Sequence, residues 1–191
     1  MTGDGESTLE ARVTALEAEA ARLRAKVAEL EDEREIASLI ARYGTAADTD
    51  DDDGFVDLYT DDGAITTWSD RAERAASWEG KEQILAFITD PVGHRLPELH
   101  GKSMHLHGNN LEIDVEDDHA VATSYGVTLV KGDAGVRILS AAGNHWELRR
   151  VDGAWRIKER RSASLGDGRF APNLEATRRR SAGEEGSDGR R

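Results

Sequence analysis

The chain has 191 residues, of which 38% are hydrophobic and 33% are charged, and its formal net charge is -13 at pH 7. This acidic balance argues against binding to nucleic acid or to an anionic membrane, because both depend on Lys and Arg that meet phosphates. No stretch approaches the ~20 apolar residues of a membrane span, and no signal-peptide pattern is present. The absence of cysteine excludes disulfides, thiolate catalysis and cysteine-ligated metals. We therefore expect a cytoplasmic protein.

The first predicted element is a helix with a seven-residue repeat over residues 9–32, after a polar segment, 1–8, that we expect to be disordered. The apolar positions of the repeat are Leu9, Val13, Leu16, Ala20, Leu23, Val27 and Leu30. Such a stripe is typical of a coiled coil. Because three heptads are marginal for a lone helix, we expect the stripe to pair with another copy of the chain. The alternative is an amphipathic helix that packs on its own domain.

The register of the apolar positions shifts near residue 33, and three helical patterns follow. The first has its apolar face at Ile36, Leu39, Ile40, Tyr43 and Ala47. A short second helix is expected around residues 55–59, and a third runs from Gly80 until Pro91 stops it. Residues 64–68 read as a strand between them.

After Pro97 the apolar period changes to two, which predicts four long strands over residues 102–115, 119–131, 136–150 and 154–165. On the first of these strands, His105 and His107 share a face with the apolar residues Leu111, Ile113 and Val115. Helices followed by an antiparallel meander predict an α+β domain over residues 33–168, with the helices packed on one curved sheet. We expect the tail, 169–191, to be disordered.

This order of elements resembles the SnoaL-like, or NTF2-like, cone fold. The resemblance covers roughly residues 33–165, and four phrases carry it beside the first helix: DLYTDDG (57–63), WEGKEQILAF (78–87), MHLHGNNLEIDVEDDHAVATSY (104–125) and NHWELRRVDGAWRIKER (144–160). The superfamily is similar in shape and diverse in function. The present chain resembles its dehydratase-like branch, which includes scytalone dehydratase and the dehydrochlorinase of lindane breakdown.

The resemblance implies an acid/base dyad. In the dehydratase-like branch, an Asp at the end of the first helix works with a His on the first long strand, and Asp48 and His105 match these positions. One extra residue after Asn109 leaves His107 as an alternative to His105. A neutral histidine is a suitable base because its ordinary pKa, about 6.5, lies near operating pH. The implied reactions are eliminations, isomerisations or ring closures, which need no cofactor.

Four further residues are candidates for substrate contact, with core packing as the alternative for each: Tyr43, Trp68, Tyr125 and Asn144. Asn144 is expected on the inward face of its strand together with Ile138 and Trp146. We interpret His94, His100 and His145 as loop or surface residues.

A metal site is a rival interpretation, because His105 and His107 followed by Glu112 resemble a cupin motif. Strict alternation places Glu112 on the opposite face from the two histidines, so we expect no metal.

These features favour a cofactor-independent lyase or isomerase, of dehydratase or cyclase type, that acts on a small hydrophobic molecule. The alternative is a noncatalytic ligand-binding or assembly module of the same fold. In either case we expect a homo-oligomer that associates through residues 9–32 and the sheet.

Overall fold

The computed structural model of the protein describes residues 3–68, 75–96 and 100–175. By its internal contacts the chain divides into two compact units, Met1–Arg34 and Glu35–Arg191. Within the described part of the chain, no helix is both long enough and apolar enough to cross a membrane.

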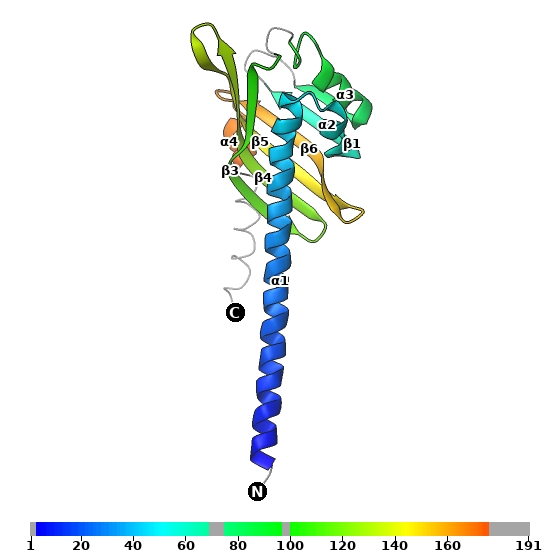
Figure 1. Ribbon diagram of the computed structural model, residues 1–191, viewed down its shortest axis with the longest axis vertical. Coiled ribbons are helices and arrows are strands. Elements are labelled where there is room, and N and C mark those ends of the chain that lie inside the picture. The colour runs from blue at the N-terminus through cyan, green and yellow to red at the C-terminus, as the bar shows by residue number, and fades with distance from the viewer. Residues whose placement is uncertain (1–2, 69–74, 97–99, 176–191) are drawn as a thin grey trace. The chain divides into compact units, whose positions relative to one another are not determined.

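Helix α1 (Gly3–Asp48) is 46 residues long and carries both of the predicted helical patterns without an interruption (Figure 1). It begins within the segment that we expected to be disordered. Good helix formers, mainly Ala, Glu, Leu and Arg, continue through the change of register and explain why the helix does not break there. In the first unit the large side chains of the heptad are exposed, from 45% for Val13 to 68% for Leu16.

In the part of the chain that the structure describes, the second unit contains the last part of α1, three shorter helices and six strands. In chain order these are α2 (Asp52–Asp57), β1 (Tyr59–Trp68), β2 (Ala76–Glu79), α3 (Gly80–Thr89), β3 (Ser103–Glu116), β4 (His119–Gly132), β5 (Gly135–Val151), β6 (Ala154–Ser164) and α4 (Phe170–Leu174). Helix α4 falls within the tail that we expected to be disordered, and residues 176–191 lie outside the described residues.

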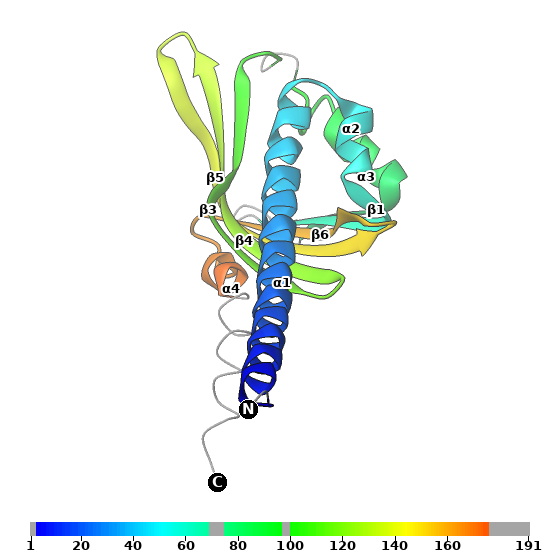
Figure 2. The same ribbon diagram turned by 60° about the horizontal axis from the view of Figure 1, so that its bottom comes forward.

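The six strands form one curved sheet in the order β2-β1-β6-β5-β4-β3 (Figure 2). β1 and β6 pair in parallel, and the other four pairs are antiparallel. This arrangement confirms the predicted α+β fold, in which helices pack on a curved and mainly antiparallel sheet.

Two local details differ from the prediction. β1 begins at Tyr59, whose pairing with Ile157 of β6 draws it out of the expected second helix, and β2 was not predicted.

The acidic run after α1 has a specific role, because the carboxylate of Asp51 accepts a hydrogen bond from the backbone N–H of Gly54 at 3.0 Å. Asp51 is therefore the N-cap of α2.

The core of the second unit joins the last turns of α1 to the sheet. Ile36, Leu39, Ile40 and Tyr43 of α1 are at most 1% exposed and belong to one cluster with buried residues of α2, α3 and the strands. The largest buried side chains on the sheet are Trp146 and Trp155. Burial of these apolar surfaces fixes the end of α1, and with it Asp48, against the sheet.

Strand β3 contains two successive bulges that decide which side chains face inward. Its register with β4 moves by one residue between Leu106 and Asn109 and by one more between Asn109 and Glu112. Asn110 has a positive φ of 53°, which fits the local distortion. One extra residue reverses the alternation of a strand, and a second one restores it. His107 therefore shares the inner face with Ile113, as predicted.

Strand β5 contains a single bulge, and here the prediction was wrong. Thr128 pairs with Ser140 but Leu129 pairs with Ile138, so Leu139 is the extra residue. Ile138 consequently faces outward with 63% exposure, whereas Trp146 faces the core. Asn144, Trp146 and Leu148, which we also expected on the inward face of this strand, do lie there and are buried.

Candidate functional site

Asp48 and His105 are joined by two hydrogen bonds. Asp48 Oδ1 lies 2.7 Å from His105 Nδ1, and the backbone N–H of His105 donates to Asp48 Oδ2 at 2.9 Å. The two side chains are 19% and 13% exposed. An imidazole that donates Nδ1–H to a carboxylate presents Nε2 as its acceptor. The pair can therefore work as a base with a fixed tautomer and a fixed ring orientation.

The carboxylate of Asp48 lies at the end of α1, and its hydrogen-bond donors come from β3. Asp48 is the last residue of α1, and there is no basic residue in the last turn of that helix. The carbonyl groups at a helix C-terminus carry partial negative charge, which disfavours a carboxylate. Both donors to Asp48 come instead from His105, 57 residues further along the chain.

Gly44 allows α1 to approach β3 closely enough for this contact. A Cβ atom at Gly44 would lie 2.5 Å from the carbonyl oxygen of His105. Gly44 is four residues before Asp48, which is about one helical turn. The absence of a side chain at residue 44 thus sets the distance between the two halves of the pair.

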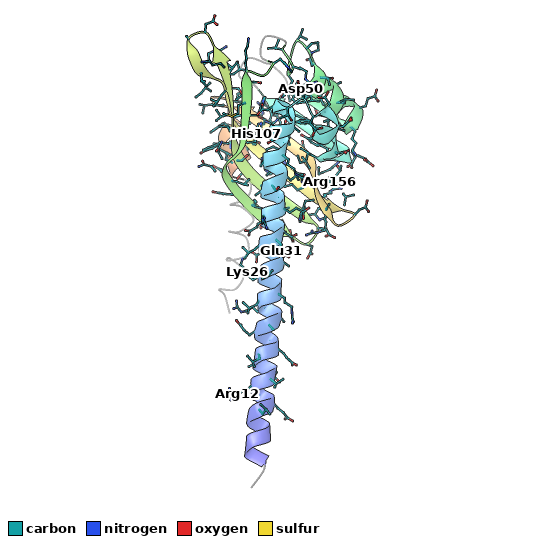
Figure 3. The ribbon with its side chains drawn as sticks, viewed as in Figure 1. Arg12, Lys26, Glu31, Asp50, His107 and Arg156 are labelled. Carbon is teal, nitrogen blue, oxygen red and sulfur yellow. The ribbon has the colours of Figure 1, made fainter. Side chains whose placement is uncertain are left out.

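His107 lies deeper than His105, within the core, and comes from β3 as Figure 3 shows. It is 7% exposed, and its Nδ1 lies 3.5 Å from Nδ2 of Asn144. Its ring meets the rings of Tyr43 and Trp146 edge to face, at centroid distances of 4.9 and 6.0 Å. Burial, together with the charge of Arg160, holds the pKa of His107 well below its ordinary value. His107 is therefore a neutral histidine in the interior.

A buried arginine lies at the centre of this polar group. Arg160 is 7% exposed, and its guanidinium donates to the hydroxyl of Tyr43 at 3.0 Å and to the side-chain oxygen of Asn144 at 2.9 Å. Its Nε has no hydrogen-bond partner. Among the residues that the structure describes, no carboxylate forms an ion pair with Arg160. A buried cation without a counter-charge is costly, so this guanidinium favours the entry of an anionic or electron-rich group.

Sequence reasoning missed Arg160 because of a bulge in β6. Leu148 pairs with Ile157 but Glu147 pairs with Glu159, so Lys158 is an extra residue. Strict alternation from Trp155 and Ile157 would turn Arg160 outward, whereas the bulge turns it into the core. The sequence carries no distinct signal for this change.

His94 is a second residue that the sequence did not indicate. We interpreted it as a loop residue, but its ring stacks on that of His105, with centroids 5.2 Å apart and planes 12° apart, and it also contacts Phe87 at 4.9 Å. Burial first, and then the charges of His105 and Arg160, lower the pKa of His94 to about 3. The uncharged ring of His94 thus covers the outer side of His105.

Among the described residues, one small cavity adjoins the pair. A cavity of about 20 Å³ is lined by Asp48, His94, Arg95 and His105 among others. This volume fits about one water molecule. Arg95 holds this segment by ion pairs with Asp52 and, at 3.2 Å, with Asp50, which Figure 3 labels just beyond α1.

The structure does not bring the remaining candidates to the pair. Tyr125 is 40% exposed on the outer face of β4, where its ring stacks on that of Phe170 at 6.2 Å. Trp68 lies 5.6 Å from the guanidinium of Arg169, next to α4. Trp68 and Tyr125 therefore lie apart from the dyad, and Tyr125 lines a separate cavity together with Phe170 and Leu174. His145 does lie on the outer face, but it is only 6% exposed, since α4 packs on β5 there.

The rival metal interpretation finds no support in the arrangement of ligands. Over residues 3–68, 75–96 and 100–175, no group of three or more His, Asp or Glu side chains is placed to hold a metal ion. Glu112 pairs with Thr123 on the outer face of the sheet, away from His107.

The chain is similar in sequence and fold to known proteins. A family model described as a SnoaL-like domain matches residues 28–161. A solved NTF2-like protein with a cystatin-like fold from Novosphingobium aromaticivorans is 29% identical, with a TM-score of 0.70 over 81% of this chain and 96% of that chain. No curated protein sequence matches the chain.

Two more distant structures share the fold. One is a Mycobacterium tuberculosis protein of unknown function, 23% identical, with a TM-score of 0.61 over 80% of this chain and 91% of that chain. The other is a Novosphingobium aromaticivorans protein proposed to be the beta subunit of an aromatic-ring-hydroxylating dioxygenase, 20% identical, with a TM-score of 0.59 over 72% and 91%. These similarities confirm the predicted SnoaL-like, NTF2-like fold.

Proposed function

We propose that this chain, which belongs to the SnoaL-like domain family, is a lyase or isomerase that works without a cofactor and uses His105 as a base oriented by Asp48. The observation that carries the proposal is the two-point contact between the carboxylate of Asp48 and both the ring and the backbone of His105. A base held in this way needs no reorganisation when it takes a proton.

In the proposed reaction, Nε2 of His105 takes a proton from a carbon beside a carbonyl or a leaving group. The electrons of the C–H bond form a double bond, either as an enolate or with departure of the leaving group. Asp48 stabilises the imidazolium that results, because its carboxylate already accepts the Nδ1–H bond. The proton then returns to another substrate atom or leaves with the departing group.

Arg160 is the group that we propose receives the developing negative charge. Tyr43 and Asn144 hold two of its nitrogens, and its Nε has no partner. Because the guanidinium is buried, its attraction for an oxyanion or a leaving anion is stronger than at the surface. The rings of Tyr43 and Trp146 beside it favour a small hydrophobic substrate.

A substrate of this kind can reach His105 only if the ring of His94 moves. The cavity beside His105 has a volume of about 20 Å³, with His94 stacked on the ring of His105. A substrate larger than water therefore displaces the His94 ring in the proposed mechanism.

The second candidate is a noncatalytic ligand-binding or assembly module. The small size of the cavity favours it, and so does the similarity to a proposed beta subunit of a dioxygenase. It predicts that substitutions in the dyad alter ligand binding or stability without any effect on turnover.

A comparison of variants separates the two candidates. The protein would be assayed against a panel of small cyclic carbonyl compounds with a β-hydroxyl or β-halogen, and the new C=C bond would be followed by its absorbance. On any compound that the protein converts, Asp48→Asn and His105→Gln should each lower kcat by about 100-fold or more. His119→Gln, which replaces an exposed histidine at the start of β4, is the control and should retain full turnover. Full turnover in both dyad variants would contradict the proposal, and binding without turnover across the panel would favour the second candidate.

A further inference from the structure

The first unit presents an apolar stripe with an ordered set of charges on both sides. The apolar positions divide into Val13, Ala20 and Val27 at heptad position a, and Leu9, Leu16, Leu23 and Leu30 at position d. All four leucines are exposed by 49% or more, and both valines by 45% or more. A stripe of this kind is stable in water when another helix covers it.

The charges that flank the stripe alternate in sign. Position g is occupied by Arg12, Glu19 and Lys26, and position e by Glu17, Arg24 and Glu31. Figure 3 labels Arg12, Lys26 and Glu31 along α1. In a parallel two-stranded coiled coil, each g residue lies next to the e residue five positions later on the partner. The three resulting pairs are all of opposite sign: Arg12 with Glu17, Glu19 with Arg24, and Lys26 with Glu31.

We propose that residues 9–34 form a parallel, in-register, two-stranded coiled coil with a second copy of this chain. The charge pattern selects the partner, because the face is complementary to itself. Valine at position a with leucine at position d favours the same two-stranded parallel arrangement.

The same charges oppose the antiparallel alternative at one kind of contact only, because in that arrangement Glu17 would still face Arg24 and Glu19 would still face Lys26. In an antiparallel pair, position e faces e and position g faces g. With full overlap of the stripe, Glu10 would face Glu31, and the symmetry of the pair repeats this contact. Like charges side by side are destabilising. The parallel arrangement contains no such contact among its three pairs.

The intrachain ion pairs of α1 do not oppose this arrangement. Glu19 bonds Arg22 and Lys26 bonds Glu29, each three residues away and each with both side chains about half exposed or more. Exposed pairs of this kind hold their side chains weakly. Glu19 and Lys26 can therefore turn towards a partner helix.

Cysteine cross-linking in the full chain tests the orientation, because the sequence contains no cysteine. Val13→Cys and Val27→Cys each place one thiol at position a, which faces its own copy in a parallel, in-register pair. Under mild oxidation, most of each variant should become a covalent dimer. Ala18→Cys, on the outer face of the helix, is the matched control and should remain largely uncross-linked. An absence of dimer for Val13→Cys and Val27→Cys would overturn the proposal.

A mixed sample tests the opposite orientation directly. In the antiparallel arrangement residue 13 faces residue 30, so Val13→Cys mixed with a differently tagged Leu30→Cys would give the mixed dimer. The parallel arrangement predicts homodimers of Val13→Cys and few mixed dimers. Association through the sheet alone would leave both thiols uncross-linked and would also count against the proposal.

Charge reversal tests whether the flanking residues specify the pairing. A g variant (Arg12→Glu, Glu19→Lys and Lys26→Glu) and an e variant (Glu17→Lys, Arg24→Glu and Glu31→Lys), each with Val13→Cys, should both lose most of their cross-linked dimer. Each variant meets like charges in its own copy, whereas a mixture of the two restores every opposite pair. Recovery of mixed dimers is the expected result. Equal cross-linking in separate and mixed samples would show that the charges do not select the partner.

Discussion

Arg160 connects three residues that are far apart in the sequence. It is bonded to Tyr43 of α1 and to Asn144 of β5, and its charge lowers the pKa of His107 on β3. Because the guanidinium is buried, its effect on neighbouring groups is screened less by solvent than that of a surface charge. One arginine thus keeps the neighbouring histidine neutral and links α1 to β5 within the core.

Because Gly44 lies close to β3, we expect its substitution by alanine to lower the free energy of unfolding, which is opposite to the usual effect of Gly→Ala in a helix. In an unconstrained helix, Gly→Ala stabilises by about 1 kcal/mol. Here the added Cβ would lie 2.5 Å from the carbonyl oxygen of His105, so Gly44→Ala must push β3 away. We expect a loss of about 1–3 kcal/mol in the free energy of unfolding, measured with urea.

Gly108→Ala is the matched control for Gly44→Ala, because a Cβ at Gly108 would meet no atom within 4 Å. Its effect should be within about 0.5 kcal/mol, as for other surface substitutions. Stabilisation by Gly44→Ala would mean that α1 and β3 are not in close contact there.

His94 gives a prediction for the dependence of stability on pH. Its pKa in the folded protein is about 3, whereas an unfolded chain has a histidine pKa of about 6.5. Between these values the unfolded state binds a proton that the folded state does not bind. The contribution of His94 is therefore complete above pH 6.5 and is lost as the pH falls towards 3, by up to about 1.4 kcal/mol per pH unit.

His94→Phe removes this titration and retains a ring against Phe87. We expect the unfolding free energy of this variant to fall less steeply than that of the wild type when urea denaturation is repeated at pH 7.5, 6 and 5. Some slope remains, because the pKa of His107 is also lowered. His100→Phe, with its exposed side chain, should keep the slope of the wild type. An unchanged slope for His94→Phe would refute the buried, neutral state of His94.

At the scale of the strand, bulges decide which parts of the site the sequence could reveal. The alternation of β3 predicted the inner face of His105 and His107, because its two bulges cancel each other. Single bulges in β5 and β6 reversed the faces of Ile138 and Arg160, and no residue pattern marks those positions. The helix end at Asp48 was predicted from the resemblance, whereas the stacking of His94 depends on packing between distant segments. The spacing of apolar residues along the chain therefore predicts the helices and strands. Which side chains face the site depends on how strands that are distant in the sequence pair with one another.

Asp51, the N-cap of α2, lies in the segment that follows Asp48, and we expect its carboxylate to contribute to stability. Asp51→Ala removes the acceptor of the Gly54 N–H bond, and loss of such a cap costs about 0.5–2 kcal/mol. Thermal unfolding of the full chain should register a lower Tm. Asp53→Ala, at an exposed position in the first turn of the same helix, should have a smaller effect. Equal effects of the two substitutions would assign the loss to general charge and not to capping.

At the scale of the whole molecule, the core of the second unit requires none of the heptad residues. Its buried members begin at Ile36, and the boundary between the two units lies at Arg34. A variant that lacks residues 1–28 should therefore retain the fold of the second unit. We expect it to keep the near-UV circular dichroism of Trp146 and Trp155, which are fully buried. Loss of that signal, with the full chain as reference, would show that the second unit depends on the first.

The two bulges of β3 allow the strand to change in length without turning its paired residues to the other face. His105 pairs with Thr128 and Ile113 pairs with Ala122, and the two residues of each pair face the same side of the sheet. We expect a deletion of one residue between His107 and Leu111 to be absorbed by the loss of one bulge, with both pairs retained. Relatives that are one residue shorter at this point should therefore keep a histidine opposite the end of the first helix, which comparison of related sequences can examine.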